Sequence, residues 1–267
     1  MTFKRKILHP VKTALIYGAV SAVLVGCATV APNSAAKAEK AEVTKKTKAP
    51  TVLEFKKGQL FSIVSVVADS DAEAKKNVAK YYKSAFPLGA KHGLKREGQL
   101  KVVASPVGDH KSDGIVFYSW PSAENEQSFE AEPAWPSIKS LRPKAWEELR
   151  IYTQEVEADM SLVFDPEKTY TLAMAWHNPE NPDHYDKYMA GIKDAAESVG
   201  GRFLYKMFDP KFESNIIKTG GPGQVTLVEW DTPQGLQAFG KTSGFKENAH
   251  YLKTGVTRFE ILALSAK

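Results

Sequence analysis

Beyond Thr51 the chain carries one pattern of strands and helices twice, and this repeat constrains its fold more than any other feature. Each copy has an alternating apolar run, an amphipathic helix, a strand, a Gly-bearing turn, a strand ending in tryptophan, a second helix and a closing strand. Period-two alternation predicts half-buried strands, and apolar residues three and four apart predict helices. The first copy has its strands and first helix at 60–67, 71–92, 100–104, 115–120 and 150–156, and the second at 170–176, 182–199, 203–208, 225–230 and 257–264.

Aromatic residues keep the same spacing in both copies. Trp120 and Trp230 end equivalent strands, with Phe129 and Phe239 nine residues later and Trp135 and Phe245 fifteen residues later. The order β-α-β-β-α-β predicts a ferredoxin-like unit, in which helices cover one face of a four-stranded antiparallel sheet. The other apolar face must also be covered. We therefore expect an α+β fold in which two tandem repeats, 52–164 and 165–267, pack sheet to sheet as an intramolecular barrel.

The second repeat resembles members of the dimeric α+β barrel superfamily, particularly its uncharacterised and antibiotic-biosynthesis-monooxygenase-like members. The residues that carry this resemblance are Val228 to Pro233, Ala238-Phe239 and Ser243 to Lys246, within a stretch of about 100 residues. Enzymes of this superfamily work between the sheet and the helices. The resemblance therefore implies a ligand pocket among the aromatic and polar residues at strand ends and on the second helices: Trp120, Trp176, His177, Asn178, Trp230 and His250.

Haem and metal chemistry are alternative interpretations of the same residues. Haem-degrading relatives would place Asn178, Trp230 and His250 at the haem, but His250 follows Phe245 by five residues, one more than that resemblance requires. A cluster around His184 and Asp186 lacks a paired metal-ligand spacing, and acidic residues are also favoured at a helix start. We expect no metal and no tightly bound cofactor.

Two further segments have competing interpretations. The glycines of 218–224 could cradle a phosphate, but no helix follows them, so a hairpin loop is favoured. The segment Glu132 to Trp146 adds prolines and tryptophans that the second repeat lacks, which predicts either a binding insertion or a cover for an open barrel end. Tryptophans in a cover would be buried. No Ser, His and acid spacing supports a hydrolase.

The N-terminus predicts export and lipid attachment. Basic residues precede an apolar run, Thr13 to Gly26, that is too short for the ~20 residues of a membrane-spanning helix. It ends in Leu24-Val25-Gly26-Cys27, and Cys27 is the only cysteine. This stretch resembles the lipobox of bacterial lipoproteins, which implies cleavage after residue 26 and diacylglyceryl on Cys27. Because Ala28 is not the Asp that retains such proteins in the inner membrane, the resemblance implies the outer membrane, with the globular part in the periplasm.

Residues 27–51 are rich in Ala, Lys, Thr and Pro and predict a flexible tether. The net charge of +5 arises from this tether and from residues 1–26, because 27 basic and 29 acidic residues remain beyond Thr51. A nucleic-acid-binding role, which needs clustered positive charge, is therefore not expected. The sequence favours an envelope lipoprotein that binds a small ligand or a protein partner without catalysis. The alternative is a cofactor-independent enzyme of the monooxygenase or isomerase kind.

Overall fold

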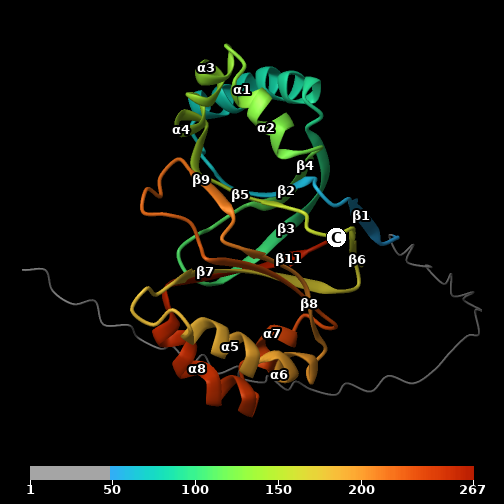
Figure 1. The fold of residues 1–267 in the computed structure, drawn as a ribbon, viewed down its shortest axis with the longest axis vertical. Coiled ribbons are helices and arrows are strands. Elements are labelled where there is room, and N and C mark those ends of the chain that lie inside the picture. The colour runs from blue at the N-terminus through green and yellow to red at the C-terminus, as the bar shows by residue number, and fades with distance from the viewer. Residues whose placement is uncertain (1–48) are drawn as a thin grey trace, which may run out of the picture. The chain divides into compact units, whose positions relative to one another are not determined.

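The structure, a computed structural model, describes residues 49–267 and shows the two repeats that the sequence predicts (Figure 1). The first repeat consists of β2 (Leu60–Ala68), α1 (Ala72–Lys91), β3 (Lys95–Val107), β4 (Gly114–Trp120), α2 (Ala123–Glu130), α3 (Trp135–Lys139), α4 (Arg142–Ala145) and β5 (Trp146–Glu155). The second consists of β7 (Thr169–His177), α5 (His184–Gly191), α6 (Lys193–Glu197), β8 (Gly201–Phe208), β9 (Lys211–Ser214), β10 (Gln224–Trp230), α7 (Gly235–Phe239), α8 (Ser243–Gly255) and β11 (Val256–Ser265). The lipobox, and the tether as far as residue 48, lie outside the described residues.

Each repeat has the strand order of a ferredoxin-like sheet. The first is ordered β3-β4-β2-β5 and the second β8-β10-β7-β11, and every pairing between neighbours is antiparallel. The two first strands, β2 and β7, are therefore central in their sheets. This arrangement confirms the predicted α+β class and the two βαββαβ repeats.

The two sheets join into one nine-stranded sheet that rolls into a barrel. On one side β11 pairs with β3, and on the other β9 pairs with β5. The chain passes from β8 to β9 through Asp209, whose φ of 44° makes the sharp change of direction. Aspartate tolerates this left-handed conformation better than most residues do. The strands β8 and β9 at the two ends of the sheet are thus linked by a connection of two residues, Asp209 and Pro210.

The apolar inner faces of the two sheets form the main core. It contains Phe61, Ile63 and Phe117 from the first repeat and Leu172 and Leu227 from the second, all at most 1% exposed. Aromatic contacts cross between the repeats, with ring centroids 5.4 Å apart for Phe61 and Tyr205. The predicted sheet-to-sheet packing is therefore present.

A small additional sheet was not predicted. β1 (Thr51–Phe55) and β6 (Met160–Phe164) pair antiparallel in a separate two-stranded sheet. Its inward residues Leu53, Phe55 and Phe164 join the barrel core, where the rings of Phe164 and Phe117 stack at 5.3 Å. β1 begins at Thr51, the last residue of the predicted tether.

The helices differ from the predictions mainly in their continuity. α1 begins after Asp71, whose carboxylate accepts from the backbone N–H groups of Glu73 and Ala74, and it ends before Gly93 as predicted. The single helix predicted over 182–199 is two helices, α5 and α6, separated at Ile192. The predicted insertion forms two short helices, α3 and α4, each with proline in its first turn.

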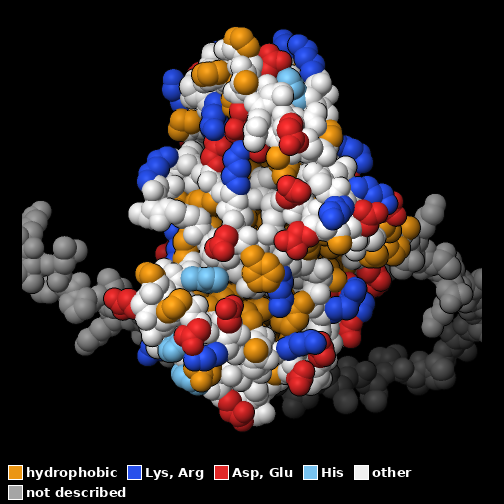
Figure 2. All heavy atoms as spheres, viewed as in Figure 1, with side chains coloured by type: hydrophobic (Ala, Val, Ile, Leu, Met, Phe, Trp, Pro, Cys, Tyr) orange, Lys and Arg blue, Asp and Glu red, His pale blue; other side chains and the backbone are white. Residues whose placement is uncertain are grey.

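The helices of the first repeat lie on one side of the barrel and those of the second repeat on the opposite side (Figure 1). On the face shown in Figure 2, acidic and basic side chains are interspersed. None of the helices within 49–267 combines the length and apolarity that crossing a membrane requires.

Candidate functional site

A pocket lies between the sheet of the first repeat and its helices. Its volume is about 120 Å³, and α2 and β9 both contribute to its lining. Its lining is rich in aromatic side chains: Tyr81, Tyr82, Phe86, Tyr118, Trp120, Phe129, Trp135 and Trp146. Small-ligand sites are typically concave and apolar with a few placed polar groups, and this pocket has that character.

Strand alternation supplies the floor of the pocket. Ser62, Val64 and Val66 of β2 face the helices, whereas Ser65 and its inward neighbours face the barrel. β5 contributes Leu149, Ile151 and Thr153 in the same way. The two floor hydroxyls, on Ser62 and Thr153, bond to each other at 2.7 Å.

The aromatic walls hold one another in place. The Tyr81 ring meets Trp146 edge-on at 5.1 Å, and Phe129 lies 4.3 Å from Trp135 and 5.0 Å from Trp120 between ring centroids. Such pairs add about 0.5 to 1.5 kcal/mol each beyond their buried area. Trp135 and Trp146 come from the predicted insertion and are 4% and 6% exposed. The insertion therefore packs with α1 over the outer face of the first sheet and not over an end of the barrel, as one interpretation of the sequence had it, and its buried tryptophans line the pocket.

Arg142 is the most buried cation of the pocket, and its side chain is 10% exposed. Its guanidinium packs over the Trp135 ring at 4.9 Å and donates from Nε and Nη2 to the Tyr81 hydroxyl at 3.0 and 2.8 Å. Nη1 donates to Glu213. Burial acts against the charge, but Tyr81 and Glu213 outweigh it and raise the pKa of Arg142 above its ordinary value. Arg142 therefore remains a cation.

The second repeat contributes charged residues to this pocket through β9. Glu213 binds Arg142 and lies 3.2 Å from Lys139 Nζ, and Lys211 Nζ lies 2.8 Å from Glu126 and 3.5 Å from Glu130 of α2. Burial opposes the charge of Glu213, yet the two cations lower its pKa. Every charged residue that lines the pocket is therefore held in an ion pair.

The corresponding space in the second repeat is packed. There α8 is a continuous helix of 13 residues that packs against α5, and Tyr185, Tyr188, Phe239 and Phe245 fill the region between helices and sheet. In the first repeat Pro136 and Pro143 accompany the division of the equivalent segment into α3 and α4. The pocket is thus a product of the difference between the repeats.

The six residues predicted for a ligand pocket do not gather at one place. Trp120 lines the pocket of the first repeat. Trp230 is buried under the second set of helices and donates to Thr171 Oγ1 at 3.0 Å. Trp176 belongs to the barrel core and donates to the Gly220 carbonyl at 3.1 Å.

The other three lie around the end of β7 and on α8. The Asn178 amide donates to the Thr254 carbonyl at 2.9 Å, and exposed His250 contacts the Glu247 carbonyl through Nδ1 at 2.9 Å. The His177 ring packs on Tyr185 at 4.9 Å, and its buried Nε2 has no hydrogen-bond partner within 49–267. In the described part of the chain, no three His, Cys, Asp or Glu residues are grouped as a metal site.

Several pocket residues have no clear signal in the sequence. Arg142 lies in the insertion Glu132 to Trp146, but its contact with Tyr81 spans 61 residues. Lys211 and Glu213 lie on a four-residue strand of the other repeat. Their placement depends on how the barrel closes, which residue spacing does not reveal.

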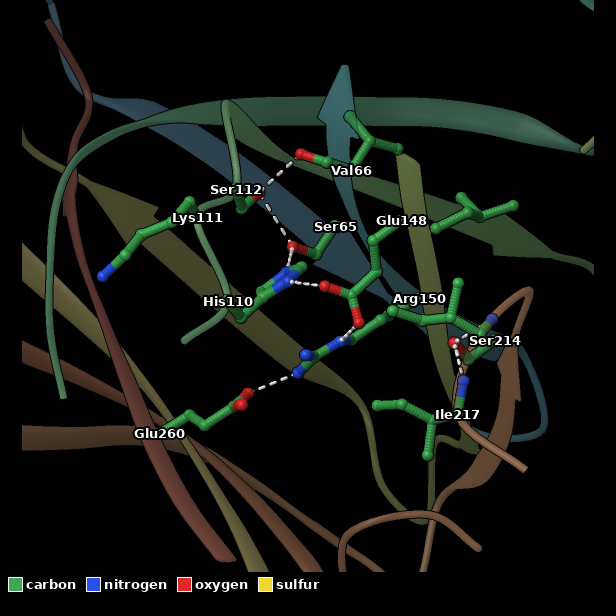
Figure 3. Close-up of polar contacts among 12 residues, drawn as sticks. Ser65, Val66, His110, Lys111, Ser112, Glu148, Arg150, Ser214, Ile217 and Glu260 are labelled. Atoms are coloured by element: carbon green, nitrogen blue, oxygen red, sulfur yellow. Dashed lines mark hydrogen bonds and ion pairs between the residues drawn. The ribbon is translucent and has the colours of Figure 1, made fainter. Parts of the chain in front are cut away.

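A second polar constellation lies inside the barrel wall (Figure 3). Ser65 Oγ and His110 Nε2 are 2.6 Å apart, and His110 Nδ1 is 2.6 Å from Glu148 Oε2. Glu148 also accepts from Arg150 Nε at 2.6 Å, and Arg150 continues to Glu260 of β11. These residues come from β2, the loop between β3 and β4, β5 and β11, so the network ties together elements that are distant in sequence.

The side chains contact one another in the order Ser65, His110, Glu148, which is the arrangement of a nucleophile, a base and an acid that orients the base. However, Ser65 is fully buried, and it also bonds Ser112 Oγ at 2.8 Å. Burial raises the pKa of Glu148, but hydrogen bonds from His110 and Arg150 lower it more strongly, to about 2. Glu148 is therefore ionised and balances Arg150, so the network holds the loop to the barrel and does not present a nucleophile.

Comparisons with known proteins assign no family to this chain. The chain matches no family model and no curated protein. Among solved structures it is similar to an anthrone oxidase-like protein, with 12% identity, coverage of 80% of this chain and 93% of that one, and a TM-score of 0.49. A putative monooxygenase from Lactobacillus acidophilus NCFM has 12% identity, coverage of 78% and 93%, and a TM-score of 0.35.

A mutant chlorite dismutase from Candidatus Nitrospira defluvii has 9% identity, coverage of 79% and 93%, and a TM-score of 0.38. At such identities and TM-scores, none of these similarities assigns a reaction to this chain.

Proposed function

We propose that this protein is a non-catalytic envelope lipoprotein that binds a small, largely apolar molecule in the pocket beneath α1 and α2. The pocket carries this proposal, because eight aromatic residues line it and its charged residues are paired with one another. A general acid, base or nucleophile needs a group free to exchange protons or electrons with a substrate. The pairing thus favours binding over reaction.

The proposed anchor rests on the sequence. Leu24 to Cys27 resembles a lipobox, and Ala28 is not the inner-membrane retention residue. The lipid on Cys27 would attach the protein to the outer membrane, and residues 27–51 would separate the binding domain from it. A flexible chain of this length spans roughly 27 Å. Such a protein would take up a ligand from the periplasm or from the bilayer surface.

Native mass spectrometry of the protein extracted from its own membranes in mild detergent tests the binding role. We expect a bound small molecule on the wild-type protein that is lost in Ala85→Phe, because Ala85 is a buried pocket-lining residue of α1. Ala190→Phe, at an exposed position on α5, is the matched control and should retain the molecule. A bound molecule that persists in Ala85→Phe would place the binding site elsewhere and refute the proposal.

A further inference from the structure

The charges around the pocket constrain the kind of ligand that it takes. Three carboxylates, of Glu126, Glu130 and Glu213, face three cations, of Lys139, Arg142 and Lys211. The charges balance, and each group has a partner of opposite sign. A charged ligand would add one uncompensated charge to a site that is partly removed from water, which is costly.

The size and walls of the pocket constrain the ligand further. A cavity of about 120 Å³ is slightly smaller than the roughly 150 Å³ apolar cavity that accommodates benzene in another protein. Rings on several sides, including Tyr81, Phe129 and Trp146, offer faces and edges for an aromatic partner. The enclosed part therefore fits one ring, and substituents can extend toward the opening.

Arg142 offers hydrogen-bond donors on the wall of the pocket. A guanidinium has five N–H groups. Arg142 uses Nε–H, one Nη1–H and one Nη2–H for Tyr81 and Glu213, and no other residue within 49–267 accepts from it. The two remaining N–H groups belong to a side chain that lines the cavity and is held by Trp135. An acceptor in the cavity can reach the Arg142 guanidinium, which lines it, while the ion pair to Glu213 stays in place.

We infer that the pocket takes an uncharged molecule with a single aromatic ring in the enclosed part and a hydrogen-bond acceptor directed at Arg142. This inference rests on the proposed binding function and specifies its ligand class. A carbonyl or ether oxygen meets the requirement, whereas a carboxylate competes with Glu213 for the same cation. An ammonium group would be repelled by the like charge of Arg142.

Four probes of similar size test the inference on the full-length protein in mild detergent: benzamide, toluene, benzoate and benzylammonium. Calorimetric titration, corrected with protein-free micelles, gives the affinity of each. We expect benzamide to bind at least about tenfold more tightly than either ion, because an unpaired buried charge is penalised strongly. It should also bind about threefold or more tightly than toluene through the bond to Arg142.

Arg142→Met should reduce the benzamide-to-toluene affinity ratio to about one, because the donor that distinguishes the two probes is gone. Arg202→Met, at a surface arginine of the second repeat with a 64% exposed side chain, is the matched control and should keep the ratio. The ranking of the four probes on the wild-type protein tests the charge argument even if Arg142→Met does not fold.

Two results would overturn the inference in distinguishable ways. If benzoate or benzylammonium binds most tightly and Ala85→Phe abolishes that binding, the pocket is a binding site but the ligand class is wrong. If the affinity of every probe is unchanged in Ala85→Phe, the pocket is not the binding site, and the proposed function fails together with the inference.

Discussion

Replacing Glu148 by Gln tests the buried network that joins the loop between β3 and β4 to the barrel. The side chains of Glu148 and Arg150 are 9% and 1% exposed, and Glu148 is bound to both Arg150 and His110. Gln keeps the shape of the side chain and removes the charge. Arg150 would then keep only Glu260 as a charged partner in the network.

The pKa of Glu148 gives the magnitude. It lies at about 2 in the folded protein, against an ordinary 4.5. At 1.36 kcal/mol per pKa unit this corresponds to about 3 kcal/mol of stability, which agrees with the ~3–5 kcal/mol cost of breaking a buried ion pair. For a domain of this size the loss should lower the melting temperature by roughly 6 to 12 °C.

The effect should also depend on pH. Because the folded-state pKa is lowered, the stabilisation is fully present above the unfolded-state pKa and is lost as pH falls toward 2. Urea denaturation of wild-type and Glu148→Gln protein, followed by tryptophan fluorescence, should therefore show a difference of about 3 kcal/mol at pH 7 that shrinks between pH 4.5 and 2. Glu147→Gln, at the exposed adjacent residue, is the matched control. A Glu148→Gln protein within ~0.5 kcal/mol of wild type at pH 7, or a difference that is independent of pH, would refute this reasoning.

Two further predictions concern the anchor and the barrel. Cys27→Ser should block lipid attachment and leave a larger precursor on immunoblots of membrane fractions, because the acceptor thiol is gone; a variant that is still cleaved and still fractionates with membranes would contradict the lipoprotein proposal. Neither 51–164 nor 165–267 should be a stable monomer, because the inner sheet faces share one core and the pairings β11·β3 and β5·β9 cross between them. At roughly 25 cal/mol per Å² of exposed apolar area, that loss is large beside a domain stability of about 5–15 kcal/mol. Size-exclusion chromatography and circular dichroism of each half check this, and a well-folded monomeric half would show that the repeats are independent.

The fold was largely accessible from the sequence because its elements are encoded locally. The alternating strands and the matched positions of Trp120 and Trp230 identify the repeats, and a bare sheet face in each requires a partner. β9 was not accessible in this way. It has four residues, and it pairs with β5 after the chain turns at Asp209, which no local pattern predicts.

The candidate site was predicted only in part. The resemblance of the second repeat directed attention to Trp230 and His250, but there Tyr185 and Phe245 occupy the space under the helices. The departure of Glu132 to Trp146 from the repeat was the informative signal, because this segment forms α3 and α4 over the pocket.

The buried network had no sequence signal. Ser65, His110 and Glu148 are separated by 45 and 38 residues, and no spacing rule relates them. Their contact depends on the register of β2 against β5 and on the loop that carries His110. Such tertiary register follows from the packing of the whole sheet and not from a local pattern.

The most direct test of the central claim is a crystal structure of the protein purified from its own membranes without refolding. The account predicts density for a small, ring-containing molecule in the pocket among Tyr81, Trp135 and Trp146, with one polar atom facing Arg142. Density for a ligand in the second repeat, around His177 or His250, with the first-repeat pocket closed by its own side chains, would contradict it.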